Sequence, residues 1–259
     1  MKIFIKIIIF FGVVNFSFAQ KSKQDLIVEE FITNCAKNIN YNIYMHDYQT
    51  CLDNGLKKDS TIAYLWQQKA MPYFKARKYE VGMMYLEKAV FYNKKRWLPY
   101  KAFINCIFVK NYQQAILDFE EAIALYGNSY EMDHSYDFYI ALSYLQLNNF
   151  ELAEAMFKKI IETQKNEQGF VHHLTLFYFG IAKYEQQKWQ ESIEVFDMAL
   201  KVYNNFSDVK FYKAFALNKL GKYEDANQLL NESKEDFKNG YTINEDNVIY
   251  ERYPYQIKW

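Results

Sequence analysis

The sequence predicts an all-α protein made of consecutive helical hairpins, and three observations lead to this fold class. Segments 76–90, 187–200 and 220–230 share a pattern in which an aromatic residue is followed three positions later by a small residue and seven positions later by a bulky apolar one. Only 8 glycines and 3 prolines occur in 259 residues, too few for the many turns of an all-β protein. Apolar and aromatic residues make up 51% of the chain, which is enough to bury a core.

The first nineteen residues are predicted to be a signal peptide. Two lysines precede an unbroken apolar run at 7–14, and small residues flank Phe18 at a typical cleavage site after Ala19. A membrane anchor is the less favoured alternative, because a spanning helix needs about 20 apolar residues and Asn15 interrupts this run. We therefore expect an exported chain that is periplasmic, envelope-associated or secreted after cleavage near Ala19.

Residues 63–239 hold five copies of the pattern, each expected to be a pair of amphipathic helices joined near the aromatic position. From first to last, the aromatic positions are Tyr79, Tyr112, Phe150, Trp189 and Tyr223, the small positions are Gly82, Ala115, Ala153, Ser192 and Ala226, and the bulky positions are Leu86, Phe119, Phe157, Phe196 and Leu230. Small residues let paired helices approach closely, and bulky residues fill the space between hairpins. The spacings of 33, 38, 39 and 34 residues place longer connections at 126–135 and 163–173, which are either tolerated insertions or part of a binding edge.

A period near 34 residues with this content resembles the tetratricopeptide repeat, a helix-turn-helix unit that stacks into a right-handed superhelix. The resemblance covers about 25–239 and implies a right-handed superhelical α-solenoid of about six hairpins with an irregular C-terminal cap. The chain departs from the family pattern at several points, among them Pro72 inside the first helix of its unit. The proline that usually ends each repeat is missing, and the tryptophan near the start of the first helix is present only as Trp66.

Residues 20–62 fit the same frame weakly and are interpreted as a degenerate first repeat that caps the array, since terminal repeats are normally atypical. In this placement Cys35 and Cys51 face each other across one hairpin. Either they form a disulfide or they are two buried thiols. The third cysteine, Cys106, falls in the core of its own helix and is expected to be unreactive.

The final segment, 240–259, has no helical period but contains four tyrosines and a terminal tryptophan. The last helical hairpin would otherwise expose its apolar face. We therefore expect this irregular aromatic tail to pack there as a cap.

The resemblance also implies a binding surface, because the first helix of each repeat lines the concave side of the solenoid. The residues expected on or near that side are Gln67, Met71, Phe74, Tyr100, Ile104, Phe138, Leu142, Phe177, Ile181, Tyr184, Phe211 and Phe215. Such an apolar and aromatic groove would suit an amphipathic helix, an extended peptide or a sugar. The alternative is that about half of these side chains belong to the core.

The sequence contains no recognisable catalytic, phosphate-binding or metal-binding motif. The adjacent His172 and His173 are not expected to share a metal, and no cofactor is predicted. Lys plus Arg and Asp plus Glu each number 31, so no basic surface for nucleic acid is indicated. The leading hypothesis is a non-catalytic interaction scaffold of the cell envelope that binds a protein or peptide through its concave face and does not span the membrane after cleavage. The alternatives are an aromatic-lined binder of oligosaccharides or small peptides and an unrecognised enzyme.

Overall fold

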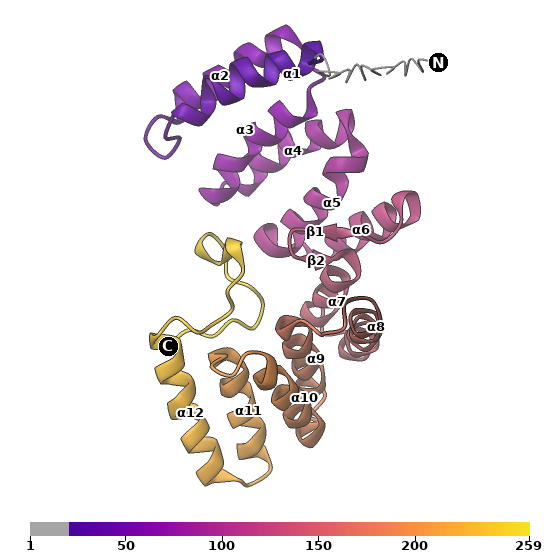
Figure 1. The fold of residues 1–259 in the computed structure, drawn as a ribbon, viewed down its shortest axis with the longest axis vertical. Helices are drawn as coiled ribbons and strands as arrows, with labels where there is room; N and C mark the ends of the chain where they lie inside the picture. The colour runs from indigo at the N-terminus through magenta and orange to yellow at the C-terminus, as the bar shows by residue number, and fades with distance from the viewer. Residues whose placement is uncertain (1–20) are drawn as a thin grey trace, which may run out of the picture.

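The computed structural model of this protein describes residues 21–259, and the predicted signal peptide at 1–19 lies outside this range. Within it the chain forms twelve α-helices and one small β-hairpin. Figure 1 shows the helices stacked in pairs along the long axis of the molecule. The predicted all-α solenoid of helical hairpins is confirmed.

Five regular hairpins follow an irregular first one. The first comprises α1 (Lys23–Val28), which continues into a π-helical turn (Glu29–Thr33), a 3-10 turn (Ala36–Asn38) and α2 (Met45–Lys58). The regular hairpins are α3 (Ala63–Lys75) with α4 (Tyr79–Tyr92), α5 (Lys94–Ile104) with α6 (Tyr112–Tyr126), α7 (Tyr136–Gln146) with α8 (Phe150–Gln168), α9 (His173–Glu185) with α10 (Trp189–Val202), and α11 (Ser207–Lys219) with α12 (Tyr223–Lys238). A further π-helical turn, Asn105–Val109, extends α5, and a 3-10 turn, Asp246–Ile249, lies in the tail.

The longer connection between α6 and α7 contains the β-hairpin. Strands β1 (Tyr130–Glu131) and β2 (His134–Ser135) are antiparallel and pair Glu131 with His134. The other long spacing results mainly from an extension of α8, which runs for 19 residues.

The turn within each regular hairpin has the same backbone shape. The second helix always begins at the aromatic position identified in the sequence, and the residue two positions earlier always has a positive φ. These turn residues are Arg77, Lys110, Asn148, Gln187 and Gly221. Only the last is a glycine, so the first four adopt a left-handed conformation that costs an ordinary residue about 1 kcal/mol. The packing of the hairpin therefore imposes the same turn conformation even where the residue in the turn is not a glycine.

Close contact between the paired helices explains the small residue at Gly82, one of the small positions of the repeat, and at Gly180 in α9. A Cβ atom added at Gly82 would lie 2.6 Å from the ring of Phe74, and one added at Gly180 would lie 2.4 Å from the ring of Phe196. Both phenylalanines are buried. At these points the ring of one helix packs directly on the backbone of the other.

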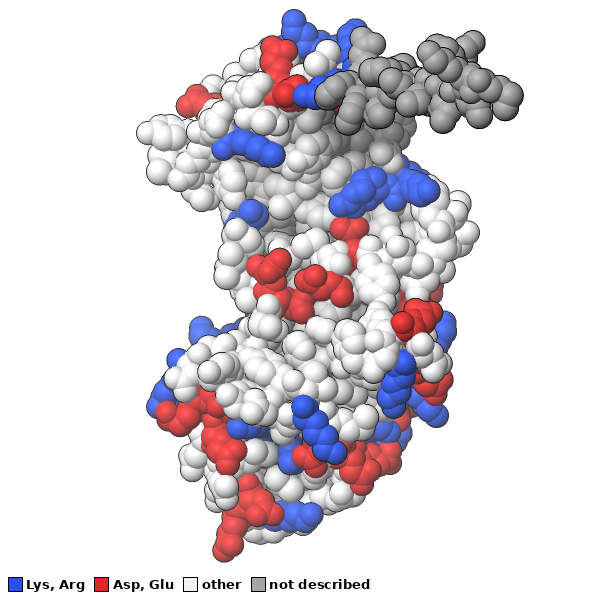
Figure 2. All heavy atoms as spheres, in the orientation of Figure 1, with Lys and Arg blue, Asp and Glu red and all other residues white. Residues whose placement is uncertain are grey.

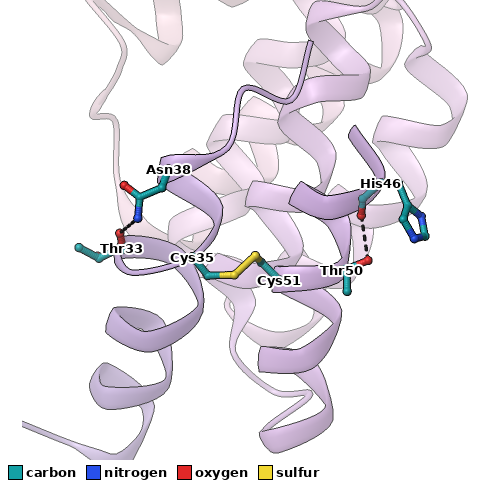
Figure 3. The surroundings of a disulfide bond; sticks show 6 residues. All are labelled: Thr33, Cys35, Asn38, His46, Thr50 and Cys51. Carbon is teal, nitrogen blue, oxygen red and sulfur yellow. Dashed lines mark hydrogen bonds between the residues drawn. A yellow bond between two sulfur atoms is a disulfide. The ribbon is translucent and has the colours of Figure 1, made fainter. Parts of the chain in front are cut away.

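The first hairpin has a core of its own, centred on Ile32, Leu52 and Leu65. Figure 3 shows Cys35, which follows the π-helical turn, joined by a disulfide to Cys51 of α2, with Cα atoms 5.9 Å apart. The bond closes a segment with little regular structure onto α2. Cys106 is buried and unpaired, and burial raises the pKa of its thiol to about 11, which makes it a poor nucleophile in the folded protein.

The tail, residues 240–259, packs only partly where the sequence led us to expect it. Its end does lie on the last hairpin, where the Trp259 ring packs edge-on against Phe211 of α11. The middle of the tail instead turns back along the first helices of the hairpins and reaches the α3–α4 turn, where Arg77 donates a hydrogen bond to the carbonyl oxygen of Tyr250 (3.2 Å). In Figure 1 the yellow tail extends from α12 toward α3 and α4. The tail therefore does not cap the last hairpin alone but crosses all five regular hairpins.

The substitution Gly180→Ala should destabilise the protein by about 1–3 kcal/mol, because the new methyl group overlaps the ring of Phe196. Chemical denaturation of the purified chain measures the loss. Combining Gly180→Ala with Phe196→Leu should cost less than the sum of the two single substitutions, since the smaller side chain leaves room for the methyl group. Additive losses would contradict the packing argument.

Replacing both Cys35 and Cys51 by serine should lower the stability of the first hairpin by about 3 kcal/mol, the value for a closed loop of roughly this length. Thermal denaturation measures the effect, and Cys106→Ser is the control in which the disulfide is intact. Thiol titration of the unfolded protein should find one free thiol before reduction and three after it. Three free thiols before reduction would contradict the disulfide.

Candidate functional site

Most residues expected to line an open groove are core residues. Of the predicted set, Gln67, Phe74, Tyr100, Ile104, Phe138, Leu142, Phe177 and Ile181 are buried. The ring of Phe177, for example, lies 5.4 Å from that of Phe206. Met71, Tyr184 and Phe211 are half-buried, and Phe215 alone is exposed. The prediction of an open aromatic groove therefore does not hold for the eight buried residues, because they fill the space between neighbouring helices.

The inner face instead presents polar side chains that hold the tail. Each of the five regular hairpins, or the segment leading into it, contributes at least one: Arg77, Lys110, His134, Tyr178 and Asp208. We call this surface the tail groove. Figure 2 shows acidic side chains gathered near the middle of the molecule, on the face where Figure 1 shows the tail.

Asp208, the second residue of α11, closes the tail into a loop. Its carboxylate accepts hydrogen bonds from the backbone N–H groups of Ile243 (3.0 Å) and Ile257 (2.8 Å) and from the hydroxyl of Thr242 (2.7 Å). The side chain is completely buried. Burial raises the pKa of Asp208, and the hydrogen bonds from the tail partly oppose this rise. One buried carboxylate thus joins the beginning and the end of the tail to the solenoid.

The middle of the tail groove binds an aromatic side chain. The hydroxyl of Tyr178 in α9 donates a hydrogen bond to the carbonyl oxygen of Pro254 (3.0 Å), and the neighbouring Tyr253 is only 1% exposed. Within the described residues, the hydroxyl of Tyr253 makes no hydrogen bond. Its ring, rather than its hydroxyl, is therefore what the groove binds.

At the N-terminal end of the groove, positive side chains meet the backbone and a carboxylate of the tail. The guanidinium Nε of Arg77 lies 3.3 Å from Oε1 of Glu251, and the hydroxyl of Tyr79 donates to the same carboxylate oxygen. Lys110 donates to the carbonyl oxygen of Arg252 (2.6 Å). Burial lowers the pKa of Lys110 to about 8.

Histidines from the two longer connections contact the start of the tail. Nε2 of His134 lies 3.1 Å from Oε1 of Glu245, and both side chains are buried. Nε2 of His173 lies 3.2 Å from the side-chain oxygen of Asn244. The ring of His172 lies between them, 5.1 Å from that of His134 and 4.3 Å from that of His173. The longer connections thus form part of the tail groove.

Sequence reasoning identified the longer connections and the aromatic tail but missed the residues that join them. Asp208, Arg77 and Lys110 have no distinguishing signal, because a charged residue near a helix end is ordinary in such repeats.

Among residues 21–259, no group of His, Cys, Asp or Glu side chains is arranged to hold a metal ion. None of the helices in this part of the chain combines the length and apolar character needed to cross a membrane.

Lowering the pH from 7.5 to 5 should destabilise the protein, because His172 must stay neutral in the folded state. Burial and the neighbouring His173 and His134 lower the pKa of His172 from 6.5 to about 3. Its contribution is therefore complete above pH 6.5 and is lost as the pH falls toward 3, with about 2 kcal/mol lost at pH 5. Thermal denaturation across this range measures the loss.

The variant His172→Asn provides the control for this prediction. Nδ1 of His172 accepts a hydrogen bond from the N–H of Leu174 at the start of α9 (3.3 Å), and an asparagine oxygen can replace that acceptor without being protonated. The pH dependence of the variant should be weaker. An unchanged pH dependence would assign the effect to other groups.

Comparison with known proteins agrees with this architecture. Residues 136–166, which cover α7 and most of α8, match the family model of the tetratricopeptide repeat. A tetratricopeptide-repeat protein from Parabacteroides merdae superimposes with a TM-score of 0.66 at 15% identity, over 82% of this chain and 80% of that one. PilW, a widely conserved type IV pilus biogenesis factor, superimposes with a TM-score of 0.64 at 12% identity, over 85% and 96%. YrrB, a tetratricopeptide-repeat protein with an unusual peptide-binding site, gives 0.51 at 14% identity, over 71% and 91%.

No curated protein matches the sequence of this chain. At these low identities the structural matches establish the fold, while the family model identifies one repeat at the position of the third regular hairpin. Both results agree with the period found in the sequence. The chain therefore has the fold of tetratricopeptide-repeat proteins, and its third regular hairpin matches the family model of that repeat.

Proposed function

We propose that this protein is a non-catalytic interaction scaffold of the cell envelope or periplasm that binds a segment of a partner protein along its inner face. The observation that carries the proposal is the tail groove, where five successive hairpins already hold an irregular, looped polypeptide. Their contacts include hydrogen bonds to its backbone at Ile243, Tyr250, Arg252, Pro254 and Ile257. Backbone contacts of this kind suit peptide recognition.

The comparisons support a role in protein interaction. The tetratricopeptide fold presents a continuous surface of stacked hairpins, and YrrB is described as having a peptide-binding site. The oligosaccharide alternative has less support, because rings such as Phe138 and Phe177, which would have stacked on a sugar, are buried in the core. The balanced charge of the chain, 31 basic and 31 acidic residues, gives no support for a nucleic-acid partner.

Two observations favour an exported location. The first nineteen residues have the pattern of a signal peptide, and the bond between Cys35 and Cys51 is of a kind that persists in oxidising compartments such as the periplasm.

The polar contacts described above hold the tail, and none of them leaves an activated nucleophile or an acid–base pair in a cleft, as a hydrolytic enzyme would require.

Chemical crosslinking of the full chain in its host cells, followed by mass spectrometry, tests this function. We expect one or a few envelope proteins to be crosslinked to the solenoid, and the N-terminal residue of the purified protein to be Gln20. A second exported protein expressed at the same level is the control for random encounters. A chain that retains Met1, or that crosslinks only to the partners of the control, would contradict the proposal.

A further inference from the structure

The tail is held in the way that a bound peptide is held. Five of its residues are buried: Ile243, Glu245, Tyr253, Pro254 and Ile257. The intervening positions are partly or fully exposed, and Ile249 at the outer side of the 3-10 turn is 75% exposed. Ile243 and Tyr253 join the main hydrophobic core of the solenoid, and Val248, Tyr250 and Tyr255 pack against it. The contacts of a bound segment are likewise concentrated in a few buried side chains.

The anchors of the tail follow a defined spacing. The carboxylate of Glu245 binds His134, and six residues later the carboxylate of Glu251 binds Arg77 and Tyr79. Two residues further along, the ring of Tyr253 is buried. The groove thus offers positive or hydrogen-bond-donating groups at two points and an aromatic pocket close to the second.

The connection to the solenoid allows the tail to leave without unwinding a helix. The tail begins at Gly240, directly after α12, in a conformation with φ of +83° that glycine adopts freely. The five regular hairpins contact their neighbours through helix–helix packing.

We propose that the tail occupies the partner site of the scaffold, and that the partner carries a segment of the same chemistry which binds by displacing it. This segment would present two carboxylates six residues apart, with an aromatic side chain two residues after the second. The inference rests on the proposed function and adds to it the recognition chemistry and the competition. The apparent affinity for the partner then equals the affinity of the open groove multiplied by the fraction of molecules in which the groove is open.

A labelled synthetic peptide of residues 242–259 is the probe, and the full chain is the receptor. A tail-release variant carries Glu245→Lys, Glu251→Lys and Tyr253→Ser and leaves the groove residues unchanged. We expect the peptide to bind this variant about tenfold more tightly than it binds the unaltered chain, as follows if the tail occupies the groove about nine-tenths of the time. Fluorescence anisotropy measures both affinities.

Two controls isolate the anchors. A chain with Asp246→Lys and Ile249→Ser, both at exposed tail positions, should bind the peptide as the unaltered chain does. A peptide carrying the three tail-release substitutions should not bind either chain. Equal affinity of the unaltered peptide for the tail-release variant and the unaltered chain would overturn the inference.

Hydrogen exchange on the unaltered chain decides the matter if the tail-release variant does not fold. The N–H groups of Ile243 and Ile257 are bound to Asp208 and should be protected from exchange. A saturating amount of unlabelled peptide should speed their exchange while amides within α9 stay protected. Continued protection at saturation would show that the peptide binds elsewhere and would overturn displacement.

Three further outcomes are informative. Protection of the tail amides that depends on protein concentration, together with a dimer in solution, would assign the groove to the tail of a second copy and overturn an external partner. Cellular partners that crosslink equally to the unaltered chain and the tail-release variant would overturn this inference while the scaffold function stands. Peptide binding as expected, with no cellular partner, would instead contradict the scaffold function alone.

Discussion

The close approach of the two helices in each hairpin is the constraint on which the rest of the structure depends. The rings of Phe74 and Phe196 lie so near the backbones at Gly82 and Gly180 that a methyl group would overlap them. Contacts of this kind fix the distance between paired helices and hence the position of the next hairpin. Because the error in each step would accumulate along the stack, a surface that crosses five hairpins requires every step to be accurate.

Asp208 shows what that accuracy makes possible. A buried carboxylate costs free energy unless hydrogen bonds replace its water, and here three donors from the tail do so. Two of these donors, the N–H groups of Ile243 and Ile257, are fourteen residues apart in the chain. The tail in the groove therefore returns to its starting point. A displacing segment must supply equivalent donors or leave Asp208 to be hydrated.

Local features of the fold could be predicted from the sequence, and distant contacts could not. In each regular hairpin the second helix begins at the predicted aromatic position, such as Tyr79 or Trp189. This position could be predicted because the repeat is a pattern of residues that are close in the sequence. The contact of Arg77 with Tyr250 joins residues 173 positions apart, and no periodicity encodes it. The inner-face residues were misplaced for a related reason, since the side of a helix that faces the next hairpin depends on how the whole stack packs.

The division between core and groove follows the same physics. Core positions are repeated because each hairpin must bury the same kind of face against its neighbours, and so they carry the family pattern. Apart from Tyr178 in the middle of α9, the residues that hold the tail lie in turns, at helix starts and in the longer connections. His134 and His173, at the ends of the two longer connections, illustrate this, as both contact the tail. Most contacts with the tail are therefore made by those parts of the chain that are least constrained by the repeat.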